Sequence, residues 1–239
     1  MSTVKIVQPG RVGDIIICLP IAKHYHDAGH KVFWPVYKEY ANLFDSIDYV
    51  EKVVIESDSI FNADVPAYEA CPDADVVVDI LIGWPNCTKQ NQIDYDNSPL
   101  VFDRWKYEKA GVPIEKKFTL EFNRNIEKEN KLKELLNLPE KYNISHSVGS
   151  SIKFNLSSIK PKNDYPTYEF QLIDGFSLFD WYGVLSEAQH LYLINSSVFN
   201  LVNGANIGVG NRTFIPIWTM AGVPKLKAVL GEGWEEYSP

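Results

Sequence analysis

An apolar strand, a glycine-containing turn and a second apolar segment follow one another in Val4–Leu19 (VKIVQPGRVGDIIICL). The residues Val4, Ile6 and Val7 predict a buried parallel strand. A strand that leads through glycines into a helix is typical of nucleotide- and phosphate-binding α/β domains, because the helix N-terminus presents unpaired N–H groups. This stretch therefore predicts an α/β protein with a ligand site at the turn.

The turn does not match the common nucleotide-binding motifs. A dinucleotide fingerprint that starts at Gly10 needs glycines where the chain has Val12 and Ile15, and no Gly-Lys-Ser/Thr of a P-loop follows. What remains is Asp14, a carboxylate directly after Gly13. It has two interpretations at this position: an N-cap of the following helix, or a group that performs acid–base chemistry.

The composition limits the class of partner and the compartment. The formal net charge of −8 and the pI of about 5.2 argue against a nucleic-acid partner. The three cysteines have no metal-ligand spacing and favour reduced thiols, and hence a cytoplasmic protein. No signal peptide is visible, and no apolar run approaches the roughly 20 residues of a membrane span.

Alternating strand and helix patterns predict a doubly wound parallel sheet in the first half of the chain. The charged segment Asn125–Asn137 predicts a helix that separates this series from a second one. We therefore expect two Rossmann-like α/β domains, residues 1–123 and residues 124–239, with a boundary near Phe122–Glu127.

Five local expectations can be compared with the structure. Asp75–Gly83 (DVVVDILIG) is the clearest candidate for a buried strand, and Phe214–Trp218 is the last expected strand. Tyr37–Ile47 is expected to be helical, whereas Trp84–Ser98 is polar and rich in turn residues. Pro20 is expected to kink or restart the first helix.

The chain begins with a strand, continues with the sequence Gly-x-x-Gly-Asp, and then has an apolar helix with an early proline. This order resembles the N-terminus of the heptosyltransferase-like glycosyltransferases, family 9, which have the GT-B fold. The matching residues are Gly13, Asp14 and Pro20. The resemblance implies two facing Rossmann-like domains, with the acceptor side in residues 1–123 and the donor side in residues 124–239. It also implies that Asp14 is the catalytic base.

A second passage, Asp174–Gly208, is similar to the donor-binding region of that family. Asn195, Ser196 and Ser197 stand where the family has Asp-Ser/Thr-Gly, and Asn200 stands where it has histidine. A helix that begins at this turn can hold a diphosphate with its N–H groups. The alternative for the three turn residues is an ordinary side-chain cap of the helix.

A third match places Lys153 where the family has a lysine that contacts the donor phosphates. The alternative is a solvated surface lysine. His146, at the end of the preceding strand, and Arg11, in the first turn, are further candidate contacts for phosphate or acceptor. Between Lys153 and Tyr168 the family has a helix, a strand and a helix, whereas this chain has a short loop, so the C-terminal domain is contracted.

No metal and no cofactor is assigned. The Asp-x-Asp at residues 73–75 precedes a strand, whereas the metal-binding motif follows one, and the Asp-x-Asp at residues 94–96 lies in a loop with no strand before it. The histidines at residues 26 and 30 have no evident third ligand. Four aromatic residues have two interpretations, stacking against an acceptor sugar or packing in a core: Trp84, Tyr95, Trp105 and Tyr107.

Together these features predict a metal-independent, inverting glycosyltransferase. Its partners would be a nucleotide-sugar donor, bound by Gly13, Lys153 and residues 195–197, and a glycan or other hydroxyl-bearing acceptor. Asp14 would be the general base. The first alternative is a non-catalytic nucleotide- or sugar-binding protein with the same fold, and the second is a sugar-nucleotide epimerase, for which acid–base groups cannot be placed.

Overall fold

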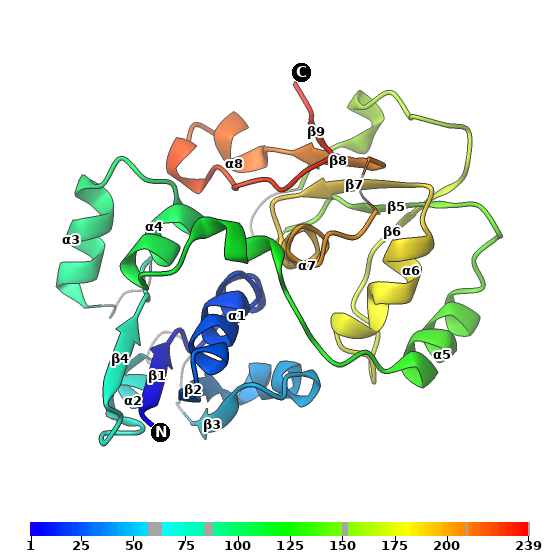
Figure 1. The fold of residues 1–239 in the computed structure, drawn as a ribbon. Helices are drawn as coiled ribbons and strands as arrows, with labels where there is room; N and C mark the ends of the chain where they lie inside the picture. Colours follow the sequence, from blue (N-terminus) through cyan, green and yellow to red (C-terminus); the bar gives the residue numbers. More distant parts are fainter. Residues whose placement is uncertain (57–63, 84–87, 150–152, 209, 239) are drawn as a thin grey trace. The chain divides into compact units, whose positions relative to one another are not determined.

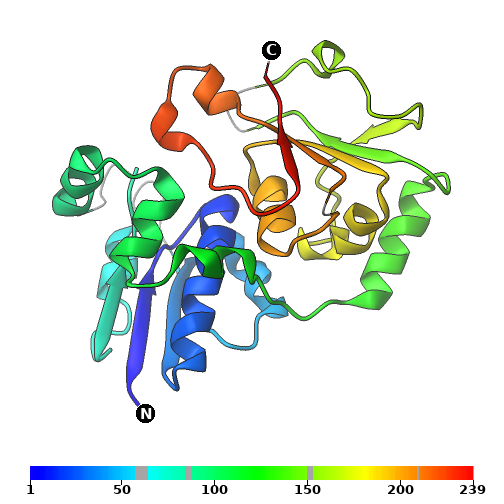
Figure 2. The same ribbon diagram turned by 45° about the horizontal axis from the view of Figure 1, so that its top comes forward.

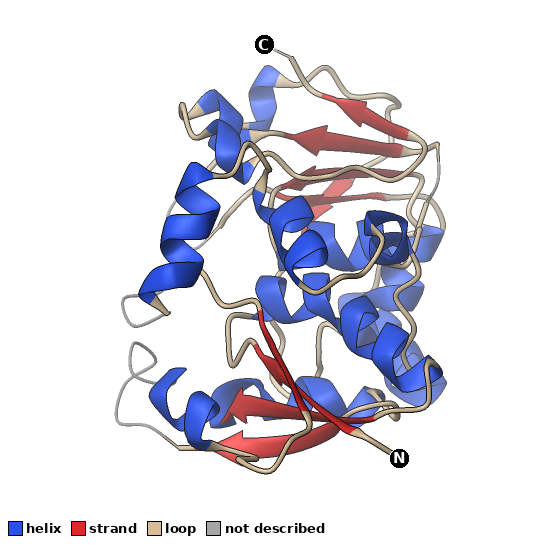
Figure 3. Cartoon of the chain, turned by 60° about the vertical axis from the view of Figure 1, so that its left-hand side comes forward, coloured by secondary structure: helices blue, strands red, loops and turns tan. Residues whose placement is uncertain are grey.

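The computed structural model describes the chain except for residues 57–63, 84–87, 150–152, 209 and 239. By its internal contacts the chain divides into two compact units, Met1–Asn123 and Arg124–Pro239. Each unit has its own parallel sheet, and Figure 3 shows the two sheets in red with helices in blue. No helix in the described part of the chain is both long enough and apolar enough to cross a membrane.

The sheet of unit 1 has four parallel strands in the order β3-β2-β1-β4. These are β1 (Thr3–Val7), β2 (Lys31–Tyr37), β3 (Glu51–Ile55) and β4 (Val76–Asp79). The central strand β1 pairs with β2 and β4, and Val4 lies opposite both Val32 and Val76. Val4, Ile6 and Val7 are fully buried, as the apolar run predicts for a central parallel strand.

The helical segments of unit 1 are connections that follow its strands (Figure 1). They are α1 (Val12–Asp27), η1 (Lys38–Ser46), α2 (Asp64–Glu69), α3 (Lys89–Asn97), α4 (Phe102–Lys109) and η3 (Ile114–Phe118). The helix α1 packs against β2, α4 and η3. The Tyr107 hydroxyl donates to the Ile17 carbonyl at 2.9 Å and the Tyr25 hydroxyl to the Ala110 carbonyl at 2.7 Å, which joins α1 to α4.

The expectation that Asp75–Gly83 is the most buried strand is wrong. Only Val76–Asp79 forms a strand, and β4 lies at the edge of the sheet. The side chains of Val76 and Val77 are therefore 40% and 52% exposed, whereas Ile80–Ile82, after the strand, are buried. The apolar run indicates that some of its residues are buried. Which residues these are depends on how β4 pairs with β1 at the edge of the sheet.

Three other local expectations also need correction. The segment expected as a helix at Tyr37–Ile47 forms a 3₁₀ helix. The helix α1 continues through Pro20, so the restart expected as one alternative there does not occur. The polar stretch expected as a loop contains α3, whose N-cap Thr88 accepts a hydrogen bond from the Asn91 N–H at 3.3 Å. Trp84, at the start of that stretch, lies outside the described residues.

Unit 2 has a five-stranded parallel sheet in the order β6-β5-β7-β8-β9. Its strands are β5 (Asn143–His146), β6 (Thr167–Glu169), β7 (His190–Ile194), β8 (Arg212–Ile215) and β9 (Trp234–Glu236). The last expected strand, Phe214–Trp218, in fact begins two residues earlier, as β8. A further strand, β9, was missed; it pairs with β8 at the sheet edge and is dark red in Figure 2.

The helical segments of unit 2 are short, apart from the first. They are α5 (Ile126–Leu136), η4 (Leu156–Ser158), η5 (Phe179–Trp181), α6 (Tyr182–Glu187), α7 (Ser197–Gly204), α8 (Ile217–Met220) and η6 (Pro224–Leu226). The charged segment forms α5, with Asn125 as its N-cap and Asn137 in the left-handed region at its end. Between Lys153 and β6 the only helical element is η4.

Candidate functional site

The turn between β1 and α1 is built around the buried side chain of Gln8. Its Nε2 donates to the Gly10 carbonyl at 2.7 Å, and its backbone carbonyl accepts from Trp34 Nε1 at 2.8 Å. The next carbonyl, that of Pro9, accepts from the Tyr37 N–H at 2.9 Å. The turn is therefore fixed to β2 as well as to β1.

The strained residue of this turn is Arg11, not a glycine. Arg11 has φ 24° and ψ 145°, whereas neither Gly10 nor Gly13 is among the described residues with positive φ. A side-chain-bearing residue outside the common backbone regions costs about 1–3 kcal/mol, and such residues cluster at functional sites. The structure thus corrects the expectation of a turn shaped by its glycines.

Asp14 is not the N-cap of α1. The helix begins at Val12, its N-cap position is Arg11, and no side-chain hydrogen bond caps it. Asp14 is the third helical residue, within the first turn, where a negative charge interacts favourably with the helix dipole. Of the two interpretations of this carboxylate, the N-cap is therefore wrong.

The Asp14 carboxyl is partly buried and has no hydrogen-bond donor among the described residues. Burial raises its pKa above the usual value, because removal from water disfavours the charged form. The nearby positive charges of Lys106 and Arg11 oppose this increase, and the charge of Asp103 adds to it. A carboxyl with a raised pKa and free lone pairs is suited to accept a proton.

Lys106 is a site residue that the sequence analysis missed. It lies on α4 without solvent exposure, and its Nζ donates to Gln8 Oε1 at 2.6 Å and to the Ile80 carbonyl at 2.7 Å. The ring of Phe102 lies 4.6 Å from the ammonium. Lysines are rarely buried, so a lysine on a helix gives no signal that distinguishes this one from its exposed neighbours.

A buried ion pair supports the same helix. Lys117 of η3 contacts the carboxylate of Asp103 on α4, and both side chains are almost inaccessible, at 2% and 6% exposure. Together with Lys106 and Asp14 they form a cluster of four ionisable groups, two positive and two potentially negative. Charge balance of this kind is what permits ionisable groups to remain in an interior.

In unit 2 the structure brings His146 and Ser196 together. Ser196 is the N-cap of α7 and accepts from the Phe199 N–H at 3.3 Å, and its Oγ lies 2.8 Å from His146 Nδ1. The His146 ring also contacts Phe170, with ring centroids 5.2 Å apart. Burial lowers the pKa of His146, although Glu169 acts in the opposite direction, so the imidazole is neutral near pH 7.

The other two turn residues have different surroundings. Asn195 donates from Nδ2 to the Leu226 carbonyl at 2.9 Å and so holds the segment after α8. Ser197 is the first residue of α7 and is partly exposed. Asn200 lies in the same helix and is buried. The cap interpretation is therefore confirmed for Ser196, whereas Asn195 makes a longer-range contact.

Lys153 is exposed, and among the described residues no hydrogen bond or ion pair joins its side chain to Ser196 or His146. Its backbone forms an antiparallel bridge with Val148, and the next residue, Phe154, donates from its N–H to the Ser147 carbonyl at 2.9 Å. Within the described part of the chain its side chain has no ion pair. Arg11, Gly13 and Asp14 belong to unit 1, whereas the remaining candidate residues belong to unit 2.

The aromatic residues near the first sheet pack in its core. Tyr95, Trp105 and Tyr107 are all at least 93% buried, and the rings of Tyr95 and Trp105 are 5.8 Å apart. This supports core packing rather than sugar stacking. For metals, no group of three potential His, Cys, Asp or Glu ligands occurs among the described residues.

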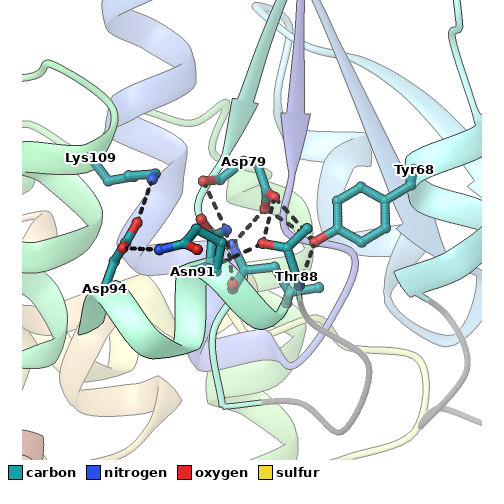
Figure 4. A network of polar contacts seen from close by, with 8 residues as sticks. Tyr68, Asp79, Thr88, Asn91, Asp94 and Lys109 are labelled. Carbon is teal, nitrogen blue, oxygen red and sulfur yellow. Dashed lines mark hydrogen bonds and ion pairs between the residues drawn. The ribbon is translucent and has the colours of Figure 1, made fainter. Parts of the chain in front are cut away.

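A polar network lies at the end of β4 (Figure 4). The Asp79 carboxylate accepts from the Tyr68 hydroxyl at 3.2 Å, from Thr88 Oγ1 at 3.4 Å and from the Leu81 N–H at 3.2 Å. Asn91 Nδ2 donates to the Asp79 carbonyl at 3.3 Å. Burial raises the pKa of Asp79. Because its oxygens already have several donors, Asp79 joins α2, β4 and α3 rather than presenting a free carboxylate.

Comparison with known proteins identifies the fold. No protein-family profile and no curated protein sequence matches the chain. A family 9 glycosyltransferase from Veillonella parvula DSM 2008 has a similar structure, with a TM-score of 0.58 at 10% identity over 90% of this chain and 80% of that one. The E. coli heptosyltransferase WaaC with ADP-2-deoxy-2-fluoro heptose gives 0.53 at 14% identity, over 98% of this chain and 92% of that one.

A third similar structure is the iron-containing dodecameric glycosyltransferase TibC from enterotoxigenic E. coli H10407. It has a TM-score of 0.56 at 12% identity, and the match covers 100% of this chain and 63% of that one. These likenesses confirm the predicted fold class: an α/β chain with two parallel sheets and the fold of GT-B glycosyltransferases.

Proposed function

We propose that this chain is a glycosyltransferase that moves a sugar from a nucleotide-diphosphate donor to an acceptor hydroxyl with inversion of configuration. The observation that carries the proposal is the desolvated Asp14 carboxyl, which lies just beyond the carboxyl end of β1 and has no described hydrogen-bond donor. Ligands of open α/β sheets bind at this edge. The ADP-sugar analogue bound to one structural neighbour supports the class of donor.

In the proposed reaction the acceptor oxygen attacks the anomeric carbon as Asp14 takes the hydroxyl proton. The bond between that carbon and the phosphate oxygen breaks, and the nucleoside diphosphate leaves with the electron pair. Attack from the face opposite the leaving group inverts the configuration. The proposed base belongs to unit 1, and of the proposed donor residues Gly13 belongs to unit 1 and the others to unit 2.

We propose that Lys153 and the N-terminus of α7, at Ser196 and Ser197, stabilise the negative charge of the leaving diphosphate without a metal ion. A lysine provides a mobile point charge, and helix N–H groups provide fixed donors. Gly13, Asn195 and Arg11 are proposed as further donor or acceptor contacts. His146 is neutral, so we assign it the role of orienting the Ser196 hydroxyl rather than of a phosphate-binding cation.

The second candidate is a nucleotide- or sugar-binding protein without transferase activity. Two observations favour it: the Asn195 amide is committed to the Leu226 carbonyl, and only η4 stands between Lys153 and β6. Both features reduce the groups available to hold a donor sugar and its nucleoside.

Thermal shift against nucleoside diphosphates and nucleotide sugars tests binding, and nucleoside diphosphate release with a panel of acceptors tests transfer. A ligand at 100 times its Kd contributes about 2.7 kcal/mol, which for a chain of this size raises Tm by about 5–10 °C. A shift together with acceptor-dependent release supports the enzyme. A shift without release from any donor favours the binding protein, and no shift with any ligand contradicts both.

Lys153→Ala should weaken nucleoside diphosphate binding about 10–100-fold, because hydrogen bonds to charged groups contribute about 1.5–3 kcal/mol. Tm without ligand should stay unchanged, since the side chain is exposed. Isothermal titration calorimetry measures the affinity, and Lys160→Ala, an exposed lysine in the same loop, is the matched control. Equal affinities for both variants and the wild type would identify Lys153 as an ordinary surface lysine.

A further inference from the structure

The burial of Lys106 calls for a physical reason, because both hydrogen-bond acceptors of its ammonium are neutral. These are the Gln8 side-chain oxygen and the Ile80 main-chain oxygen. Removing a lysine charge from water is costly unless it is compensated by partners or nearby charge. Neighbouring Asp103 contacts Lys117 instead. The charge of Lys106 is thus balanced only by the cluster as a whole, whereas its hydrogen bonds go to neutral groups just after β1 and β4.

A continuous series of contacts leads from Lys106 to the strained turn. A lysine ammonium only donates hydrogen bonds, so it requires the oxygen of the Gln8 amide to face it. With Oε1 directed at Lys106, the amide nitrogen faces the Gly10 carbonyl, to which it donates at 2.7 Å. Gly10 precedes Arg11, the residue with positive φ, and α1 begins directly after it.

We propose that Lys106 and Gln8 are positioning residues for Asp14. Lys106 fixes the orientation of the Gln8 amide, Gln8 holds the Gly10 carbonyl, and this holds the strained turn from which α1 presents its carboxylate. This role of Lys106 and Gln8 rests on the proposed function, in which Asp14 is the base. The geometry of the turn itself does not depend on that function.

The charge of Lys106 has a second effect on the same carboxylate. The groups that act electrostatically on Asp14 are Lys106, Arg11 and Asp103, from α4 and the turn. Of these, Lys106 and Arg11 favour the ionised form that a base needs, whereas Asp103 opposes it. The Asp14 charge is in turn felt by Cys18 on α1 and by Tyr40 on η1. Loss of the Lys106 charge should therefore raise the pKa of Asp14.

Lys106→Met tests both effects, with Lys109→Met as the matched control. Lys109 is on the same helix but is exposed and pairs with Asp94 at 3.2 Å. For Lys106→Met we expect kcat about 100-fold lower, since a displacement of about 1 Å costs that much, and a donor KM within a few-fold of wild type. The acid limb of kcat/KM should move to higher pH. Lys109→Met should leave all three unchanged.

Two further variants keep the test decisive if Lys106→Met does not fold. Lys106→Gln removes the charge, and because its amide can both donate and accept it no longer fixes which end of the Gln8 amide faces it. Gln8→Met keeps the charge but removes the contact with Gly10. We expect a similar loss of kcat in each, with the donor KM preserved, and an increased Asp14 pKa in the lysine variant alone. A wild-type kcat in either folded variant would overturn the proposal.

The pKa of Asp14 can be measured without turnover, by NMR titration of the chain labelled with ¹³C at aspartate carboxyls. An increased pKa in the lysine variant, in a protein that transfers no sugar, would support the electrostatic link and reject the proposed reaction. If Asp14→Asn abolishes transfer while Lys106→Met and Gln8→Met keep the wild-type kcat, the positioning proposal fails alone.

Discussion

Asp14→Asn is expected to abolish sugar transfer while preserving the fold and the affinity for the donor. Asparagine keeps the shape of the side chain but cannot take the acceptor proton. A positioned base contributes about 10²–10⁴-fold in rate, which corresponds to about 3–5 kcal/mol of activation free energy. The measurement is kcat with the true donor and acceptor, together with the donor Kd from calorimetry.

The matched control is Asp27→Asn, which removes a carboxylate from the last turn of the same helix. Asp27 is exposed and pairs with Lys23 at 2.7 Å, so its loss should leave kcat unchanged. Transfer by Asp14→Asn within a few-fold of the wild-type rate would exclude Asp14 as the base. The raised pKa of its carboxyl would then be a consequence of burial without a catalytic role.

The same variant should also change how stability depends on pH. Because the pKa of Asp14 is raised in the folded state, the carboxyl favours folding below the unfolded pKa of 3.8. That contribution is lost as the pH rises through the folded pKa, since the charged form is then desolvated. Asp14→Asn should therefore increase Tm relative to wild type at neutral pH, and the difference should shrink towards pH 3. A Tm difference that does not vary with pH would contradict the desolvation argument.

Asp103→Ala is expected to have the largest effect on stability. It removes the carboxylate that contacts the buried ammonium of Lys117. Loss of one partner of a buried pair costs about 3–5 kcal/mol, because the other charge stays buried. Urea denaturation should show that loss, and Tm should fall by roughly 6–20 °C. The control is Glu56→Gln, whose exposed pair with Lys38 at 3.0 Å should contribute at most about 1 kcal/mol.

The double variant Asp103→Leu with Lys117→Met distinguishes the loss of a partner from the loss of packing. Replacing both members of a buried pair with apolar residues is often neutral or stabilising. The double variant should therefore be more stable than Asp103→Ala. If the double variant and Asp103→Ala are equally unstable, the loss of stability arises from altered packing around these side chains rather than from an uncompensated charge.

The sequence by itself determined the elements whose burial is continuous along the chain. The strand β1 and the helix α1 were predicted from apolar runs, and β7 is buried at every position, as its sequence HLYLI indicates. Local capping also follows from sequence, as at Ser196 of α7, because it depends only on nearby backbone groups. The fold class was predicted from the alternation of these elements and from the motif around Asp14.

Only the tertiary structure decided which residues lie at edges and which polar groups are buried. The run DVVVDILIG became an exposed edge strand followed by a buried segment, because exposure depends on the neighbour in the sheet. The polar stretch before α4 became the helix α3, and β9 formed by pairing with β8. These outcomes depend on contacts between distant parts of the chain, which hydrophobic periodicity does not record.

The site divides in the same way. The sequence proposed Asp14 and its turn as a candidate site, but the strain at Arg11 and the hydrogen bond from Asn195 to the Leu226 carbonyl appear only in the folded chain. Lys106 is the clearest case, because Gln8 is 98 residues away in sequence and yet accepts its hydrogen bond. A lysine in a sequence predicts an exposed side chain. Its burial results from folding, which brings a neutral amide and a main-chain carbonyl to its ammonium.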